Sequence, residues 1–161
     1  MMKQKISLMI ATFFYAGLAK KAPGTVGSLC TLPLAFVAAY FFGFSGVFYA
    51  ALIAFFVGVF AVKEVIKGSK NKDPGKVVID ETAGQIVSFI LVAPYLEGNL
   101  SWQAFLLYAL GFGLFRLFDI AKFGPVEWAD QKFKNEWGVM LDDVFAGLEA
   151  AVVLMFLASG L

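Results

Sequence analysis

The chain has 161 residues, which fits one domain, and 60% of them are apolar. A soluble domain usually has about 45–50% apolar residues, so the excess is typical of a chain that crosses a membrane. The net charge of +1 argues against a nucleic-acid partner. The lack of histidine excludes every mechanism that needs an imidazole. Cys30 is the only cysteine in the sequence, so the chain cannot form an internal disulfide.

The hydropathy pattern predicts an all-α fold, a polytopic helical membrane bundle that forms a single domain over residues 1–161. Lys20 and Lys21 follow the first apolar stretch, residues 6–18, where a signal-peptide cleavage site would need small residues. We therefore expect this stretch to be retained as an interfacial or re-entrant helix. Five later stretches can cross a hydrocarbon core about 30 Å thick. They are residues 26–42, 46–66, 83–96, 102–118 and 144–161.

The basic residues are distributed very unevenly over the connections between these stretches. All 13 lysines and arginines fall on one side of the five-span arrangement, and the positive-inside bias predicts that this side is cytoplasmic. Among the acidic residues, Glu97 alone falls on the far side, and Glu149 lies inside the last span. The polar chemistry of the chain is therefore predicted at the cytoplasmic surface.

The first of four polar clusters is KKAPGTVGS, residues 20–28. Unpaired backbone amides at a helix start suit a phosphate group, and Lys21, Thr25 and Ser28 would add donors. An ordinary helix start with a proline turn is the alternative interpretation. A Walker loop is excluded, because GxxxxGK[ST] is absent.

The second cluster is VVIDETAG, residues 77–84, in which Asp80 and Glu81 are adjacent where a loop enters a helix. Favourable placement of acids in a first turn is one explanation, but two carboxylates at a membrane boundary also need compensation by a cation. The third cluster runs from 116 to 130. Arg116, Asp119 and Lys122 are spaced to share one helix face, either as an internally paired ladder or as a metal ligand between two phosphate-binding cations.

The fourth cluster is GVMLDDVFAGLEA, residues 138–150. Asp142 and Asp143 are predicted to cap the last span, with Glu149 two turns deeper on the face of Asp142. A carboxylate within the bilayer costs about 2.5 kcal/mol or more, so Glu149 must face the bundle interior or be protonated. Oxygen ligands without histidine or a thiol cluster indicate Mg²⁺ or Mn²⁺. With cations and a glycine turn, they indicate phosphoryl chemistry on a lipid phosphate.

These four blocks resemble the phosphatidylglycerophosphatase A family: KAPGTVGS, VIDETAG, RLFDIAK followed by a proline and an aspartate, and GVMLDDVFAG occur in the family's order over residues 21–147. The resemblance implies an all-helical, Mg²⁺-dependent phosphatase that converts phosphatidylglycerophosphate to phosphatidylglycerol. It also implies a protein of bacterial membranes. Together with the charge distribution, this predicts a multi-pass protein of the bacterial cytoplasmic (inner) membrane with its active site facing the cytoplasm.

We therefore predict one set of acidic residues as the catalytic and metal-binding residues: Asp80, Glu81, Asp119, Asp142 and Asp143, with Asp130 as a further metal-ligand candidate. A second set is predicted to bind the substrate phosphate: Lys21, Thr25, Gly27, Ser28, Arg116 and Lys122. Attack by water and an aspartyl-phosphate intermediate both remain compatible with these residues.

Other functions were weighed against the same pattern. A CDP-alcohol phosphotransferase-like enzyme also has clustered aspartates, but its DG-x2-AR…G-x3-D-x3-D spacing is absent. A small cation transporter or channel subunit would place ionisable residues near mid-bilayer in several spans, where only Glu149 fits. A purely structural subunit would leave the four polar clusters unexplained. The pattern does not predict an oligomeric state.

Overall fold

The computed structural model describes residues 2–67, 74–122, 124–132 and 135–160, without the side chains of residues 129–131. These residues form helices and no β-strand, as predicted. The elements are α1 (Met2–Ala11), the 3₁₀ helix η1 (Ala16–Leu18), α2 (Pro23–Ile66), α3 (Ile79–Val87), α4 (Ala93–Leu96), α5 (Trp102–Ala121), α6 (Pro125–Lys132) and α7 (Glu136–Ala158).

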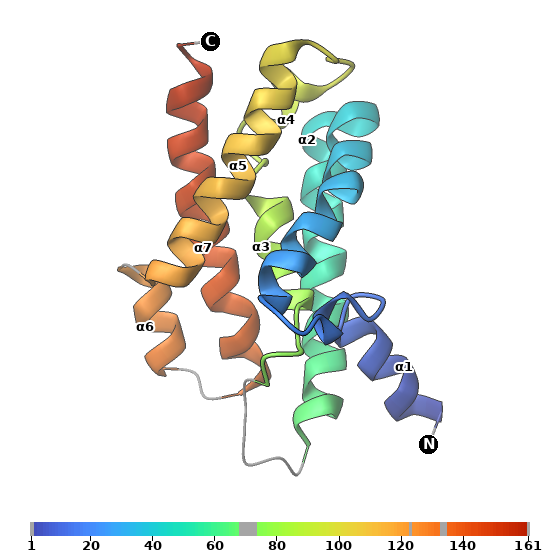
Figure 1. The fold of residues 1–161 in the computed structure, drawn as a ribbon. Helices are drawn as coiled ribbons and strands as arrows, with labels where there is room; N and C mark the ends of the chain where they lie inside the picture. Colours follow the sequence, from blue (N-terminus) through green and yellow to red (C-terminus); the bar gives the residue numbers. More distant parts are fainter. Residues whose placement is uncertain (1, 68–73, 123, 133–134, 161) are drawn as a thin grey trace.

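Helix α2 consists of two arms that reverse direction at Gly43 (Figure 1). Gly43 has φ 53° and ψ −137°, a conformation that glycine adopts without strain. The carboxylate of Glu97 packs over this turn, where a Cβ on Gly43 would overlap it. The amide of Gly98 donates to the carbonyl of Tyr40 at 2.9 Å. The break lies between the first two predicted spans.

The prediction of one helix over residues 83–96 is wrong. Helix α3 ends at Val87, and α4 begins only at Ala93. Pro94 stands in the first turn of α4. It has no N–H to continue the hydrogen-bonding pattern of a preceding helix, and its fixed φ suits the first turn of a new helix. The two pieces are therefore separate short helices.

Helix α7 begins at Glu136, well before the predicted start at residue 144. The side chain of Asn135 caps it, because its Oδ1 accepts from the amides of Trp137 at 3.1 Å and Gly138 at 3.2 Å. The prediction that Asp142 and Asp143 cap this helix is therefore wrong. They lie inside it, and both are buried.

The N-terminal segment packs against the chain that leads into α3. Helix α1 is followed by a turn with positive φ at Phe13, Phe14 and Tyr15 and then by η1. The amide of Val78 donates to the carbonyl of Ala11 at 2.8 Å. Helix α1 begins before the predicted stretch, residues 6–18, and its placement at the membrane surface stays a prediction.

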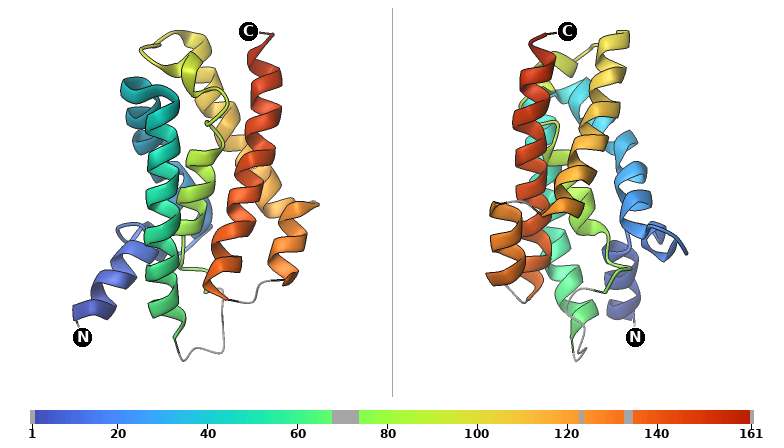
Figure 2. Two further views of the ribbon diagram at one scale, coloured as in Figure 1. Left: turned by 180° about the vertical axis from the view of Figure 1, so that it is seen from behind. Right: turned by 60° about the vertical axis from the view of Figure 1, so that its left-hand side comes forward.

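Two described helices, α2 and α5, are long and apolar enough to cross a membrane. The N-terminus, the end of α2 and the start of α7 lie at one end of the molecule, whereas the C-terminus, the α4–α5 connection and the turn of α2 lie at the other (Figure 1). Figure 2 shows from behind the second arm of α2, α3 and α7 side by side.

A glycine contact sets the distance between α3 and α7. A Cβ on Gly84 would overlap the carbonyl of Asp143, and a Cβ on Gly147 would overlap the carbonyl of Gly84. Because neither residue has a Cβ, the two backbones touch. This close approach brings Asp143 of α7 beside the first turn of α3.

Candidate active site

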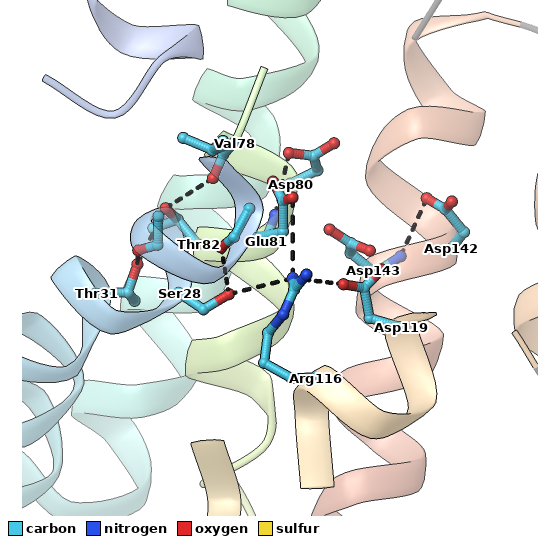
Figure 3. A network of polar contacts seen from close by, with 12 residues as sticks. Ser28, Thr31, Val78, Asp80, Glu81, Thr82, Arg116, Asp119, Asp142 and Asp143 are labelled. Carbon is cyan, nitrogen blue, oxygen red and sulfur yellow. Dashed lines mark hydrogen bonds and ion pairs between the residues drawn. The ribbon is translucent and has the colours of Figure 1, made fainter. Parts of the chain in front are cut away.

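Three carboxylates from two helices form a cluster. Asp80 and Glu81 of α3 and Asp143 of α7 each offer an oxygen atom, and these atoms all lie within 4.8 Å of one another. Asp80 is 7% exposed and Asp143 is 4% exposed. Figure 3 shows the three residues with Asp119 and Arg116 beside them.

Burial and mutual repulsion both act on this cluster. Burial, and after it the charge of Asp80, raises the pKa of Glu81 well above its ordinary value. Burial, and after it the charge of Asp119, raises the pKa of Asp143 in the same direction. The charged forms of these acids are therefore disfavoured unless a cation compensates them.

Arg116 of α5 is a cation beside the cluster and contacts three side chains (Figure 3). Its Nη1 lies 2.5 Å from Asp119 Oδ2, 3.9 Å from Glu81 Oε1 and 3.5 Å from the hydroxyl oxygen of Ser28. The Nε of Arg116 and the Oε2 of Glu81 are buried without a hydrogen-bond partner. These contacts hold the guanidinium at the edge of the cluster, and its Nε–H can still donate a hydrogen bond.

Lys122 lies just beyond α5, in the left-handed conformation with φ 47°. Its ammonium is 3.1 Å from Asp142 Oδ2 of α7. Arg116 and Asp119 pair along α5 as expected, but Lys122 does not continue that face, because the helix ends before it. One of its partners, Asp142, is on the helix that also carries Asp143.

The glycine-rich turn contributes only part of its predicted residues to the cluster. Ser28 is fully buried, and its hydroxyl donates to the carbonyl of Gly24 at 2.9 Å. Gly27 allows α2 to pack closely against Val78. Lys21 is exposed and Thr25 is half-buried, and among the described residues neither side chain forms a hydrogen bond or ion pair with the acids.

Three further residues complete the comparison with the sequence. Asp130 lies in α6, and its side chain is outside the described residues. The backbone amides around Gly24 were predicted to orient the phosphate, but its packing against the cluster was not predicted: a Cβ there would overlap Glu81 Oε1. Gln85 was also not predicted. It is fully buried one turn after Glu81, and a lone amide in an apolar stretch was the available signal.

The residues of the cluster fit a divalent metal ion. All the donors are carboxylate oxygens, which Mg²⁺ prefers, and the buried, unpartnered Glu81 Oε2 is one of them. A cation would also offset the repulsion that raises the pKa of Glu81 and Asp143. The cluster is thus compatible with a metal-dependent phosphatase.

An all-helical fold with a buried carboxylate cluster beside an arginine and a lysine is compatible with one class of protein, the phosphomonoester hydrolases. Comparison with known proteins places the chain among these hydrolases. The family model for phosphatidylglycerophosphatase A matches residues 9–158, and the chain belongs to that family. The predicted family resemblance and the prediction of an enzyme are both confirmed.

Individual relatives agree with the family match. The chain is 32% identical to a phosphatidylglycerophosphatase A of Haemophilus influenzae, over 94% of this chain and 91% of the relative. It is 28% identical to that of Escherichia coli, over 92% and 81%. It is also 32% identical to a putative phosphatidylinositol-3-phosphatase of Bacteroides thetaiotaomicron, over 92% and 91%. No solved structure matches the chain.

Proposed function

We propose that the chain removes the terminal phosphate of phosphatidylglycerophosphate, with Mg²⁺, at the cytoplasmic face of a bacterial inner membrane. The observation that carries this proposal is the carboxylate cluster of Asp80, Glu81 and Asp143 beside Arg116, in a chain whose family is named for that reaction. The reaction adds water to phosphorus and breaks the bond between phosphorus and the headgroup oxygen. That oxygen takes a proton and leaves as the alcohol of phosphatidylglycerol.

The residues divide into two roles. Asp80, Glu81 and Asp143 hold the metal ion, with Asp119, Asp142 and Asp130 as further candidates. Bound Mg²⁺ supplies positive charge that favours attack on phosphorus and stabilises the transition state. Arg116 neutralises charge that develops on the phosphoryl oxygens, and Asp119 holds its guanidinium in place.

Lys122 is proposed as the second phosphate-binding cation, and its ion pair with Asp142 positions its ammonium group. Ser28, Thr25 and the amides around Gly27 are proposed to orient the phosphate at the start of α2. Lys21 is proposed to attract the substrate from the membrane surface, which suits its exposed position.

The topology belongs to the same proposal. Each arm of α2 has about 20 residues, enough for a core about 30 Å thick, and α5 is comparable in length. Together with the α3–α4 pair and α7, they make a five-span bundle with the basic end in the cytoplasm. Single cysteines at Lys67 and Asn99, in a Cys30→Ser background, test this. An impermeant maleimide applied to intact cells should label only position 99, and the reverse result would contradict the orientation.

The activity is tested with purified protein in detergent. Wild-type protein should release phosphate from phosphatidylglycerophosphate with Mg²⁺ but not with EDTA. Asp80→Asn should abolish release while the protein stays folded, and Arg116→Lys should lower kcat/KM by about 100-fold, since lysine cannot reproduce a bidentate contact. Release without Mg²⁺, or full activity of Asp80→Asn, would contradict the metal assignment.

A second substrate is supported by the Bacteroides relative, which is named for a different lipid phosphate and is as similar to this chain as the Haemophilus protein. Phosphatidylinositol 3-phosphate should therefore be tested in the same assay. A higher kcat/KM for this lipid than for phosphatidylglycerophosphate would reassign the substrate and leave the phosphatase chemistry in place.

A further inference from the structure

Most of the buried polar atoms without a partner lie on α3 and α5. Among the described residues they are Glu81 Oε2 and Gln85 Oε1 on α3, the Tyr108 hydroxyl and Arg116 Nε on α5, and one atom elsewhere, Glu149 Oε2 on α7. Leaving such an atom unpaired costs free energy, so each one calls for an explanation. Glu81 and Arg116 belong to the candidate active site. Gln85 and Tyr108 have no role in it so far.

Gln85 follows Glu81 by one helical turn and lies on the same face of α3. Its side chain is fully buried. The amide nitrogen donates to the hydroxyl of Ser88 at 3.0 Å, and that hydroxyl donates to the backbone carbonyl of Gln85 at 2.7 Å. These bonds fix the amide group and leave Oε1 as an acceptor without a donor.

Tyr108 precedes Arg116 by about two turns, on the side of α5 that faces α3. It is 8% exposed. Its ring lies 5.1 Å from that of Phe89, after the end of α3, and 5.7 Å from that of Phe36, in the first arm of α2. Tyr108 therefore lies where α5 meets the first arm of α2 and the segment after α3. Together with Glu81, Gln85 and Arg116, it defines a seam of unpartnered atoms between α2, α3 and α5 that starts at the carboxylate cluster.

We propose that Gln85 and Tyr108 bind the uncharged polar groups of the lipid substrate. Gln85 Oε1 accepts a hydrogen bond from the headgroup hydroxyl next to the phosphate-bearing carbon. The Tyr108 hydroxyl donates to an ester carbonyl oxygen of the same lipid. This inference rests on the proposed function, since it takes the phosphate to lie at the carboxylate cluster.

The order of groups along the lipid supports this assignment. Starting from the terminal phosphate, phosphatidylglycerophosphate presents a hydroxyl, then a phosphodiester, then two esters and the acyl chains. Starting from the cluster, the seam presents an acceptor at Gln85, then a donor at Tyr108 among aromatic rings. A hydroxyl needs an acceptor and a carbonyl needs a donor, so the sequence of partners matches.

The consequence is selectivity for a hydroxyl beside the reacting phosphate. A site built to bond a substrate hydroxyl rejects an analogue that lacks it, because its own polar group stays unpaired. Phosphatidylglycerophosphate and phosphatidylinositol 3-phosphate both have a hydroxyl at this position. We expect wild-type protein to prefer phosphatidylglycerophosphate over its deoxy analogue, phosphatidyl-propanediol phosphate, by about tenfold, the effect of one hydrogen bond.

The test compares these two lipids in wild-type protein and in Gln85→Leu, which keeps the approximate size of the side chain and removes the amide. The readouts are kcat/KM for phosphate release and lipid binding by native mass spectrometry. Gln85→Leu should turn over and bind the two lipids within about twofold of each other. Gln103→Leu makes the same change at an exposed position of α5 and should keep the tenfold preference. A preference retained in Gln85→Leu, or absent from wild-type protein, would overturn the role of Gln85.

Tyr108 is tested with a diether analogue of phosphatidylglycerophosphate, which has no ester carbonyl. Tyr108→Phe should weaken binding of the diester about tenfold and leave binding of the diether unchanged. Tyr49→Phe, at an exposed position of α2, should alter neither. Equal losses on both lipids would show a structural role and overturn the assignment. If the protein released no phosphate but kept these binding preferences, the proposed function would fail and the subsite would stand.

Discussion

Replacing Asp143 by asparagine should stabilise the metal-free protein and remove most of its response to Mg²⁺. The ligand atoms of the three carboxylates lie within 4.8 Å of one another, and two unit charges at that separation repel by about 3.5 kcal/mol at an effective dielectric constant of about 20. Three such pairs would repel by about 10 kcal/mol, which is comparable to the whole stability of a typical domain. The metal-free cluster must therefore take up protons, in agreement with the raised pKa of Glu81 and Asp143.

Proton uptake relieves part of this repulsion, at a cost of about 1.4 kcal/mol for each pH unit by which the pH exceeds the pKa. An asparagine at position 143 removes that cost and two of the three repulsive pairs. We expect a gain of about 1–3 kcal/mol for the metal-free variant at neutral pH. For a chain of this size that corresponds to a Tm about 3–10 °C higher.

The assay is thermal unfolding of detergent-purified protein, followed by tryptophan fluorescence in EDTA and in MgCl₂. Mg²⁺ at about 100 times its Kd should stabilise wild-type protein by about 2.7 kcal/mol, and Asp143→Asn by less than half of that. Glu127→Gln removes one negative charge from an exposed position of α6 and should behave as wild-type. A full Mg²⁺ response in Asp143→Asn, together with an unchanged Tm in EDTA, would refute the reasoning.

Further predictions follow from the same geometry. The pKa of Glu81 and that of Asp143 are raised on folding. At the same pH the folded, metal-free protein therefore binds more protons than the unfolded chain. Its free energy of unfolding should fall as the pH rises above about 4. Mg²⁺ displaces those protons, so its apparent affinity in a calorimetric titration should increase over the same range; a flat profile would contradict this. Gly24→Ala should lower kcat at least about tenfold, because the added Cβ overlaps Glu81 Oε1, and unchanged turnover would place Glu81 outside the site. Asn135→Ala should lower the free energy of unfolding by about 1 kcal/mol through loss of the α7 cap, measured by denaturant titration, without changing KM.

The sequence predicts some side-chain pairings of the candidate site but not others. The pairing of Arg116 with Asp119 is local, because i, i+3 spacing on one helix brings the two side chains together. The pairing of Lys122 with Asp142 joins two helices. It depends on α5 ending at Ala121 and on the left-handed conformation of Lys122, neither of which is visible in the charge pattern.

The sequence likewise predicts some helix boundaries but not others. The two arms of α2 and the reversal near Gly43 were predictable from two apolar runs separated by a short connection. The α3–α4 break was missed because residues 83–96 are mostly apolar, and hydropathy does not register the effect of Pro94 on hydrogen bonding. The early start of α7 was missed because residues 136–143 are too polar for a span, although Asn135 is a favourable cap.

The all-helical class, the family and the residue types of the cluster can be predicted from the sequence, because they depend on composition, local periodicity and short motifs. Which acids come together depends on contacts between helices that are distant in the chain. Asp80 and Asp143 are 63 positions apart in the chain, and they approach because Gly84 and Gly147 let the backbones of α3 and α7 touch. Such contact depends on the absence of side chains at two distant positions at once, which no single stretch of sequence reveals.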